Sequence, residues 1–161
     1  MIRNKLKKNA KKVDKFILNF LKKQKKSLLV EPMKYGVISG GKKIRSTVIF
    51  DIGKLLNIKE TKLLSICAAV ECIHSYSLIH DDLPCMDNDS MRRGKLSTHK
   101  RYGEATAVLA GNSLLTLAFE IISDKKSLLS SKQKNEIINL LSYCSGHTGI
   151  AGGQELDLKF E

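Results

Sequence analysis

The amino-acid sequence predicts an all-α bundle. Its 161 residues are 42% hydrophobic, which is enough for one domain with a buried core. Apolar residues recur at helical spacing in several long stretches, and the chain contains only two prolines. It also lacks the Asn-Gly and Asp-Gly pairs that mark short β-hairpins. We therefore expect residues 1–161 to form a single helical domain.

Residues 1–26 are expected to form a basic amphipathic helix. They contain eleven Lys and Arg residues against one acid, Asp14, and so carry most of the formal net charge of +12. The apolar positions at helical spacing are Val13, Phe16, Ile17, Phe20 and Leu21. The lysines fall on the opposite face, which we interpret as solvated rather than as a surface for RNA or a membrane. No nucleic-acid partner is expected.

The next elements follow from breaks in the apolar pattern. The loop signals are Pro32, Gly36, Gly40 and Gly41. A second helix is expected from about residue 43, with an inner face made of Ile44, Val48, Ile49, Ile52 and Leu56. A third helix is expected over residues 60–82, and Pro84 ends it. Because this third helix is apolar on most sides, we expect it in the middle of the bundle.

The second half of the chain continues the helical pattern. Residues 83–99 are polar and are expected to form a loop, and residues 103–122 a fourth helix. A fifth helix is predicted to start near Ser130, because Ser130 and Gln133 have the spacing of a capping box. Its apolar positions are Ile137, Ile138, Leu141 and Cys144.

The cysteines and the hydropathy indicate a cytoplasmic protein. No apolar run reaches the ~18 residues of a membrane span, so no stable membrane insertion is expected. The cysteines, Cys67, Cys72, Cys85 and Cys144, lack metal-binding spacing, and we interpret them as reduced thiols mostly in a core. A zinc site using Cys72 and His74 is a weaker alternative, because no second ligand pair of suitable spacing follows.

The stretch SLIHDDLPCMDNDSMRRGK, residues 77–95, is the main candidate for a functional site. It places Asp81, Asp82 and Asp87 ahead of the pair Arg92 and Arg93. Clustered carboxylates suit Mg²⁺, which is commonly held by one or two carboxylates together with substrate phosphates, and guanidinium groups bind phosphate oxygens. We therefore predict a metal-bound phosphate or diphosphate between the acids and the arginines. The alternative is a solvated acidic helix end followed by a basic loop.

Two further patterns accompany this stretch. His74 lies seven residues before Asp81, so both side chains face the same way and can line one cavity, to which Asp87 must return from the loop beyond Pro84. The segment GGKKIR, residues 40–45, combines two glycines with basic residues at a helix start, which favours an anion. It is not a P-loop, because GxxxxGK[ST] is not met.

Five segments together resemble a known family: GGKKIR, HSYSLIHDDLPCMDNDSMRRGK, THKRYGEA, LAGNSLLTLAF and GGQELDL. In this order and spacing they look like the trans-isoprenyl diphosphate synthases, or polyprenyl synthetases, most closely the bacterial farnesyl diphosphate synthases. The likeness runs from about residue 35 to the end. It implies an isoprenoid-synthase helical bundle, a homodimer, and Mg²⁺-dependent head-to-tail condensation of isopentenyl diphosphate with an allylic diphosphate.

The resemblance also implies roles for single residues. It assigns Asp81, Asp82 and Asp87 to Mg²⁺ bridging to the allylic diphosphate, which Arg92 also contacts. It assigns Lys42, Arg45, His74 and Arg93 to isopentenyl diphosphate. It places Gln154 and Asp157 near the allylic substrate, and it gives Tyr76, five residues before Asp81, the position that limits the product to fifteen carbons.

The sequence departs from the family in several places. Ser46 stands where a proline is usual, and Asn112 where an aspartate is usual. The family's second aspartate-rich motif, DDxxD, does not follow Asp82, and neither do the downstream lysines. We therefore expect residues 27–161 to correspond to the first half of the family fold. The chain is then a truncated form, from an incomplete gene or a proteolytic remnant, and is not expected to assemble the family's full metal site alone.

Three other functions were weighed against this one. An HD-type metal phosphohydrolase would use His80 and Asp81, but such a site needs an upstream His ligand, and none precedes His74. A geranylgeranyl diphosphate synthase would share the motifs and differ in product length. A non-catalytic, prenyl-synthase-like interaction subunit would have no need of the aspartates and arginines.

Overall fold

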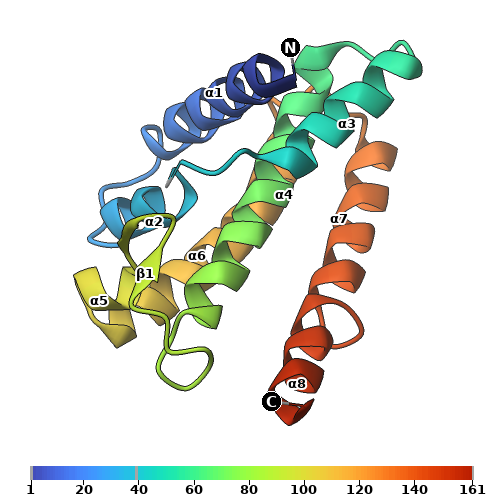
Figure 1. Cartoon of the computed structure of the whole chain (residues 1–161). Coiled ribbons are helices and arrows are strands. Elements are labelled where there is room, and N and C mark those ends of the chain that lie inside the picture. The colour runs from blue at the N-terminus through green and yellow to red at the C-terminus, as the bar shows by residue number, and fades with distance from the viewer. Residues whose placement is uncertain (1, 39, 161) are drawn as a thin grey trace.

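The computed structural model describes residues 2–38 and 40–160 and shows an all-α bundle with one short hairpin, which confirms the predicted fold class (Figure 1). The helices are α1 (Ile2–Leu21), α2 (Val30–Val37), α3 (Ile44–Leu55), α4 (Glu60–Asp81), α5 (Thr98–Tyr102), α6 (Glu104–Ser123), α7 (Ser131–Ser145) and α8 (Ile150–Phe160). The strands are β1 (Met91–Arg92) and β2 (Lys95–Leu96). In Figure 1, α1 and α2 lie on one side of α4, and α7 and α8 on the other.

The centre of the bundle is the pair of helices α4 and α6, which pack along each other. Small buried side chains such as Ala68, Ala107 and Ala110 let the two backbones approach closely. This confirms the expected central position of residues 60–82. Although charged and polar residues interrupt their apolar runs, both helices are long and apolar enough on average to cross a membrane, by length and composition only.

Helix α1 buries the predicted face. Val13, Ile17 and Leu21 are in the core, with Phe16 and Phe20 packed against it. Two lysines of the opposite face form ion pairs instead of being only solvated: Lys5 with Asp51 at 2.5 Å, and Lys12 with Glu60 at 2.5 Å. These pairs join α1 to α3 and to the start of α4.

Residues 30–37 form the helix α2, so the loop expected from Pro32 and Gly36 is wrong over this range. Pro32 is tolerated because it lies in the first turn of α2. A backbone amide at that position would have no acceptor within the helix, so its absence costs no helical hydrogen bond. Gly36 lies against Ile79 of α4, where a Cβ atom would collide, so it marks a close helix contact and not a turn. Gly40 and Gly41 do lie in the following loop.

Helix α3 begins as expected but buries a different face. Ile49 packs against the core, whereas the other members of the predicted inner face, Ile44, Val48, Ile52 and Leu56, are exposed. The buried residues are Ser46, Thr47, Phe50 and Gly53. Gly53 lies against Leu63 with no room for a Cβ atom, because α3 approaches α4 through its small residues. Of the large apolar side chains, only Phe50 and Ile49 face the bundle, and Ile44, Val48, Ile52 and Leu56 point away from it.

The polar stretch after α4 contains structure that the sequence did not predict. Met91 pairs with Leu96, and Arg92 with Lys95, in an antiparallel hairpin, and α5 follows. The two turn residues, Arg93 and Gly94, have φ angles of 54° and 76°, as a two-residue hairpin turn requires. The turn residues are Arg-Gly and not the Asn-Gly or Asp-Gly pairs typical of such turns, so the sequence did not indicate the hairpin.

The end of the described chain combines a confirmed helix with one that was not predicted. Ser130 and Gln133 form the predicted capping box at the start of α7. Helix α8 was not assigned from the sequence, and its described residues are exposed or half-buried. Cys67 and Cys72 are buried, and burial raises the pKa of each thiol to about 12, whereas Cys85 and Cys144 are exposed. The expectation of mostly buried cysteines is therefore right for two of the four.

Candidate functional site

The aspartates lie where α4 ends. Pro84 cannot continue the helix, and the chain turns back, so that the backbone amide of Asp87 donates to the carbonyl of Asp81 at 3.0 Å. Asn88, at a φ of 53°, donates from its amide to the carbonyl of Leu83 at 3.0 Å and closes the turn. The loop thus brings Asp87 beside Asp81, as the spacing required.

The electrostatics of Asp81 suit a bound cation. Partial burial raises the pKa of its carboxyl group above the usual value, and the negative charge of Asp87 raises it further. Among the described residues, no group of three or more His, Cys, Asp or Glu side chains gathers closely enough to hold a metal ion. Two neighbouring carboxylates nevertheless match the needs of Mg²⁺, which takes its other ligands from water and phosphate.

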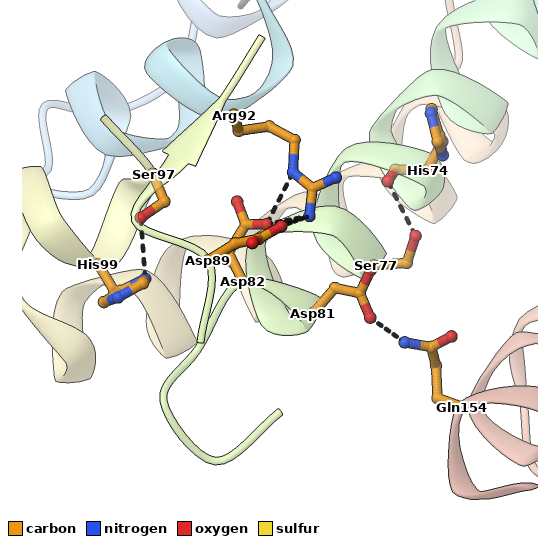
Figure 2. A network of polar contacts seen from close by, with 9 residues as sticks. All are labelled: His74, Ser77, Asp81, Asp82, Asp89, Arg92, Ser97, His99 and Gln154. Carbon is orange, nitrogen blue, oxygen red and sulfur yellow. Dashed lines mark hydrogen bonds and ion pairs between the residues drawn. The ribbon is translucent and has the colours of Figure 1, made fainter. Parts of the chain in front are cut away.

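Asp82 points away from Asp81 and toward Arg92 of the hairpin (Figure 2). Its carboxylate is buried and accepts from Nε of Arg92 at 2.7 Å and also from Nη2. The same Nη2 donates to Asp89 at 3.1 Å. The structure therefore places Arg92 in direct contact with two acids, where the sequence had suggested a ligand between acids and arginines. Burial raises the pKa of Asp82, and the contact with Arg92 opposes that rise.

Gln154 reaches Asp81 from a distant part of the sequence. Its side-chain nitrogen on α8 donates to Oδ1 of Asp81, 73 residues away in the chain (Figure 2). Asp157 lies one turn further along α8 and is exposed. The structure thus brings Gln154, but not Asp157, to the aspartates.

An apolar cleft of about 610 Å³ runs between α4 and the helices α7 and α8. His74 and Asp81 both line it, which confirms that one cavity receives these two side chains. Its apolar walls are formed by Val70, Ile73, Leu78, Leu140, Leu141 and Ile150. The cleft can hold a hydrocarbon chain with one end at the carboxylates.

A second cavity, of about 330 Å³, gathers the basic residues. Lys42, Arg45, His74 and Arg93 all line it, together with Gly40, Gly41, Lys43, Ile44 and Glu71. Gly41 lies against the guanidinium group of Arg93, which a side chain at this position would have to displace. The cavity therefore gathers positive charge, which suits an anion.

His74 stays neutral in this setting. Burial, followed by the positive charges of Arg45 and Arg93, lowers its pKa to about 4. At neutral pH its ring can donate one hydrogen bond and accept another. Arg45 and His74 line both the basic cavity and the apolar cleft, so the two cavities are adjacent.

Tyr76 and His80 lie on a different face of α4. Their rings meet edge to face, with centroids 5.3 Å apart, and Nε2 of His80 lies 3.0 Å from the carbonyl oxygen of Val108 on α6. Tyr76 is therefore not among the residues that line the cleft. His80 is engaged with α6, which removes the support for a phosphohydrolase site shared with Asp81.

The sequence analysis missed Glu71 and counted Lys43 only within the basic segment GGKKIR. Glu71 is buried and lines the basic cavity, and Nζ of the buried Lys43 donates to the carbonyl of Val37 at 2.9 Å and pairs with Asp14 at 3.2 Å. An acid within the apolar run AAVECI was the available signal for Glu71. Lys42 and Lys43 are adjacent and of the same type, so the sequence did not indicate that Lys43 is the one that is buried and paired with Asp14.

Comparisons with known proteins agree with this geometry. A family model described as polyprenyl synthetase matches residues 26–161. The farnesyl diphosphate synthase of Buchnera aphidicola subsp. Acyrthosiphon pisum is 50% identical over 91% of this chain and 52% of its own length. That of Escherichia coli is 46% identical over 83% of this chain and 45% of its own length. The chain thus spans about half the length of the curated relatives it matches.

A solved structure has the same arrangement of helices. An FPP/GFPP synthase from Zymomonas mobilis matches with a TM-score of 0.90 and 41% sequence identity, over 96% of this chain and 56% of that one. The two proteins are therefore similar in sequence as well as in fold.

Proposed function

Because this chain belongs to the polyprenyl synthetase family, we propose that it binds the two substrates of a prenyl transfer reaction. The reaction is the condensation of isopentenyl diphosphate with dimethylallyl or geranyl diphosphate to farnesyl diphosphate. One observation carries the proposal: the basic cavity and the apolar cleft share Arg45 and His74, and the cleft ends at Asp81. This arrangement suits two diphosphates with a hydrocarbon chain beside them.

Each cavity is proposed to take one substrate. Lys42, Arg45, His74 and Arg93 would bind isopentenyl diphosphate through its phosphate oxygens. Asp81 and Asp87 would hold Mg²⁺ at the allylic diphosphate, and Asp82 would join them by turning from Arg92. The ion would supply charge compensation for the leaving group. Arg92 would contact the same diphosphate. Gln154 would orient Asp81, and Asp157 would lie near the allylic substrate.

The chain's part in the chemistry is to position and to exclude water. Loss of diphosphate from the allylic substrate leaves an allylic cation, which the double bond of isopentenyl diphosphate attacks; a proton then passes to the released diphosphate. No side chain has to act as nucleophile. The apolar walls of the cleft keep water from the cation, and the basic residues hold the second substrate in place.

The proposal is tested with two forms of the protein. The 161-residue chain should bind isopentenyl diphosphate in titration calorimetry, and should bind dimethylallyl diphosphate only with Mg²⁺. A chimaera that continues this chain with the remaining part of its Buchnera relative should convert labelled isopentenyl diphosphate to a fifteen-carbon product. A folded chimaera without Mg²⁺-dependent product would contradict prenyl transfer. Binding of neither diphosphate by the chain itself would favour the non-catalytic interaction subunit.

Tyr76 is proposed to limit the length of the product. In the chimaera, Tyr76→Ala should shift the product from fifteen toward twenty or more carbons, because the family resemblance assigns this large ring to the position that limits product length. Chromatography of the dephosphorylated products measures the shift, with Tyr143→Ala on the exposed face of α7 as control. Tyr76 packs against His80 and does not line the cleft, so a longer product would be direct evidence for its role. An unchanged product would remove Tyr76 from this role and reopen geranylgeranyl diphosphate as the product.

We extend the proposal to a homodimer, which the family resemblance implies, and to a cytoplasmic location, which the cysteines and the hydropathy indicate. Two apolar side chains of α6, Val108 and Leu109, are exposed, and a homodimer interface can cover them.

A further inference from the structure

The N-terminus of α3 obtains its cap from another helix. The preceding residue, Lys43, has a left-handed conformation with a φ of 44°, and within the described residues no local side chain caps α3. The amide groups of a first helical turn need acceptors from outside the helix. Glu71 of α4 supplies one, because its Oε1 accepts from the backbone amide of Ser46 at 3.3 Å and from the Ser46 hydroxyl at 2.8 Å.

This contact is buried and joins distant parts of the sequence. Ser46 is fully buried, Glu71 is 3% exposed, and the two are 25 residues apart. A buried carboxylate is costly unless hydrogen bonds and positive charge compensate it. The positive end of the α3 dipole and the two Ser46 donors provide that compensation.

The pair of residues determines where the basic side chains lie. Ser46 follows Arg45 directly, and Lys42 precedes the same helical turn. On α4, Glu71 and His74 are three residues apart and share a face. We propose that Glu71 is a positioning residue for the basic cavity, which holds the N-terminal turn of α3, and with it Arg45 and Lys42, against His74. This rests on the proposed binding of isopentenyl diphosphate in that cavity.

A simple charge effect predicts the opposite result. Of the described residues that line the cavity, Glu71 is the one with an acidic side chain. A carboxylate repels a bound diphosphate. If Glu71 acted only through its charge, its removal would strengthen anion binding. If it positions α3, removal of its acceptor oxygens weakens binding although a negative charge is lost. The sign of the change therefore distinguishes the two roles.

The experiment measures the affinity of the 161-residue chain for isopentenyl diphosphate by titration calorimetry without metal. Glu71→Leu should weaken binding about tenfold, as expected for loss of a buried hydrogen bond to a charged group. Glu71→Gln keeps an acceptor oxygen for Ser46 and should stay within about twofold of the unaltered chain. Ser46→Ala should weaken binding about threefold. Ser65→Ala, a buried serine of α4 remote from the cavity, is the matched control and should change nothing.

Amide hydrogen exchange of Ser46 gives a second, ligand-free measurement. It should be faster in Glu71→Leu than in Glu71→Gln, with the helical signal in circular dichroism unchanged. If Glu71→Leu does not fold, Ser46→Ala tests the contact alone, because it removes the hydroxyl donor and keeps the Glu71 charge: a positioning role predicts weaker binding, and a pure charge effect predicts no change. Equal or tighter binding by both Glu71 variants would overturn the positioning role and leave the proposed function intact. No binding by the unaltered chain would overturn the cavity assignment itself, even where the exchange data show Glu71 capping α3.

Discussion

Replacing Asp81 with alanine is expected to lower the kcat of the prenyl-transferring chimaera about a thousandfold, because charge on the leaving diphosphate would no longer be compensated. Asp81 ends α4 beside Asp87 and lines the apolar cleft, so it is the carboxylate nearest to a substrate held there. In the 161-residue chain, the same substitution should abolish the Mg²⁺-dependent part of dimethylallyl diphosphate binding. Steady-state kinetics and calorimetry with and without EDTA measure the two effects.

The matched control is Asp124→Ala, just after α6, which should leave both quantities within about twofold of the unaltered protein, as is usual for substitutions away from a site. Binding of isopentenyl diphosphate in the basic cavity should also persist in the Asp81 variant, because Asp81 is not among the residues that line that cavity. Full Mg²⁺-dependent binding after loss of Asp81 would refute the metal assignment.

Arg92→Ala is expected to reduce the free energy of unfolding by about 2–3 kcal/mol at neutral pH, since it leaves the buried Asp82 carboxylate without its cation. Arg92 is partly exposed, so water can replace some of the lost interaction, and the loss of stability is smaller than for a fully buried ion pair. Urea unfolding followed by circular dichroism measures the change. Arg3→Ala, an exposed arginine of α1, is the control.

The loss should depend on pH. Burial raises the folded-state pKa of Asp82 above its unfolded value, so the folded protein binds the proton more tightly than the unfolded chain does. Stability contributed by this group therefore falls as the pH rises through the interval between the two pKa values. Without Arg92 the folded-state pKa rises further, so the deficit of Arg92→Ala should shrink as the pH falls below it. A deficit equal at pH 4 and pH 7.5 would contradict this account.

Periodicity and local chemistry sufficed for much of the fold. The buried stripe of α1 and the capping box at Ser130 were predicted from spacing alone, because both depend on residues within a few turns of one helix. The shared orientation of His74 and Asp81 followed from helix geometry in the same way. The residue types after Asp81 indicated a cation and a diphosphate without reference to the fold.

The sequence by itself determined the all-α class, the central helix and the family to which the chain belongs. Only the tertiary structure decided which side of α3 is buried, because Gly53 and Ser46 allow an approach to α4 that the larger apolar side chains prevent. It also decided that Gln154 reaches Asp81 and that Glu71 caps α3. These contacts join residues far apart in the chain. Their energies depend on how the helices pack against each other, and a local sequence pattern does not predict that packing.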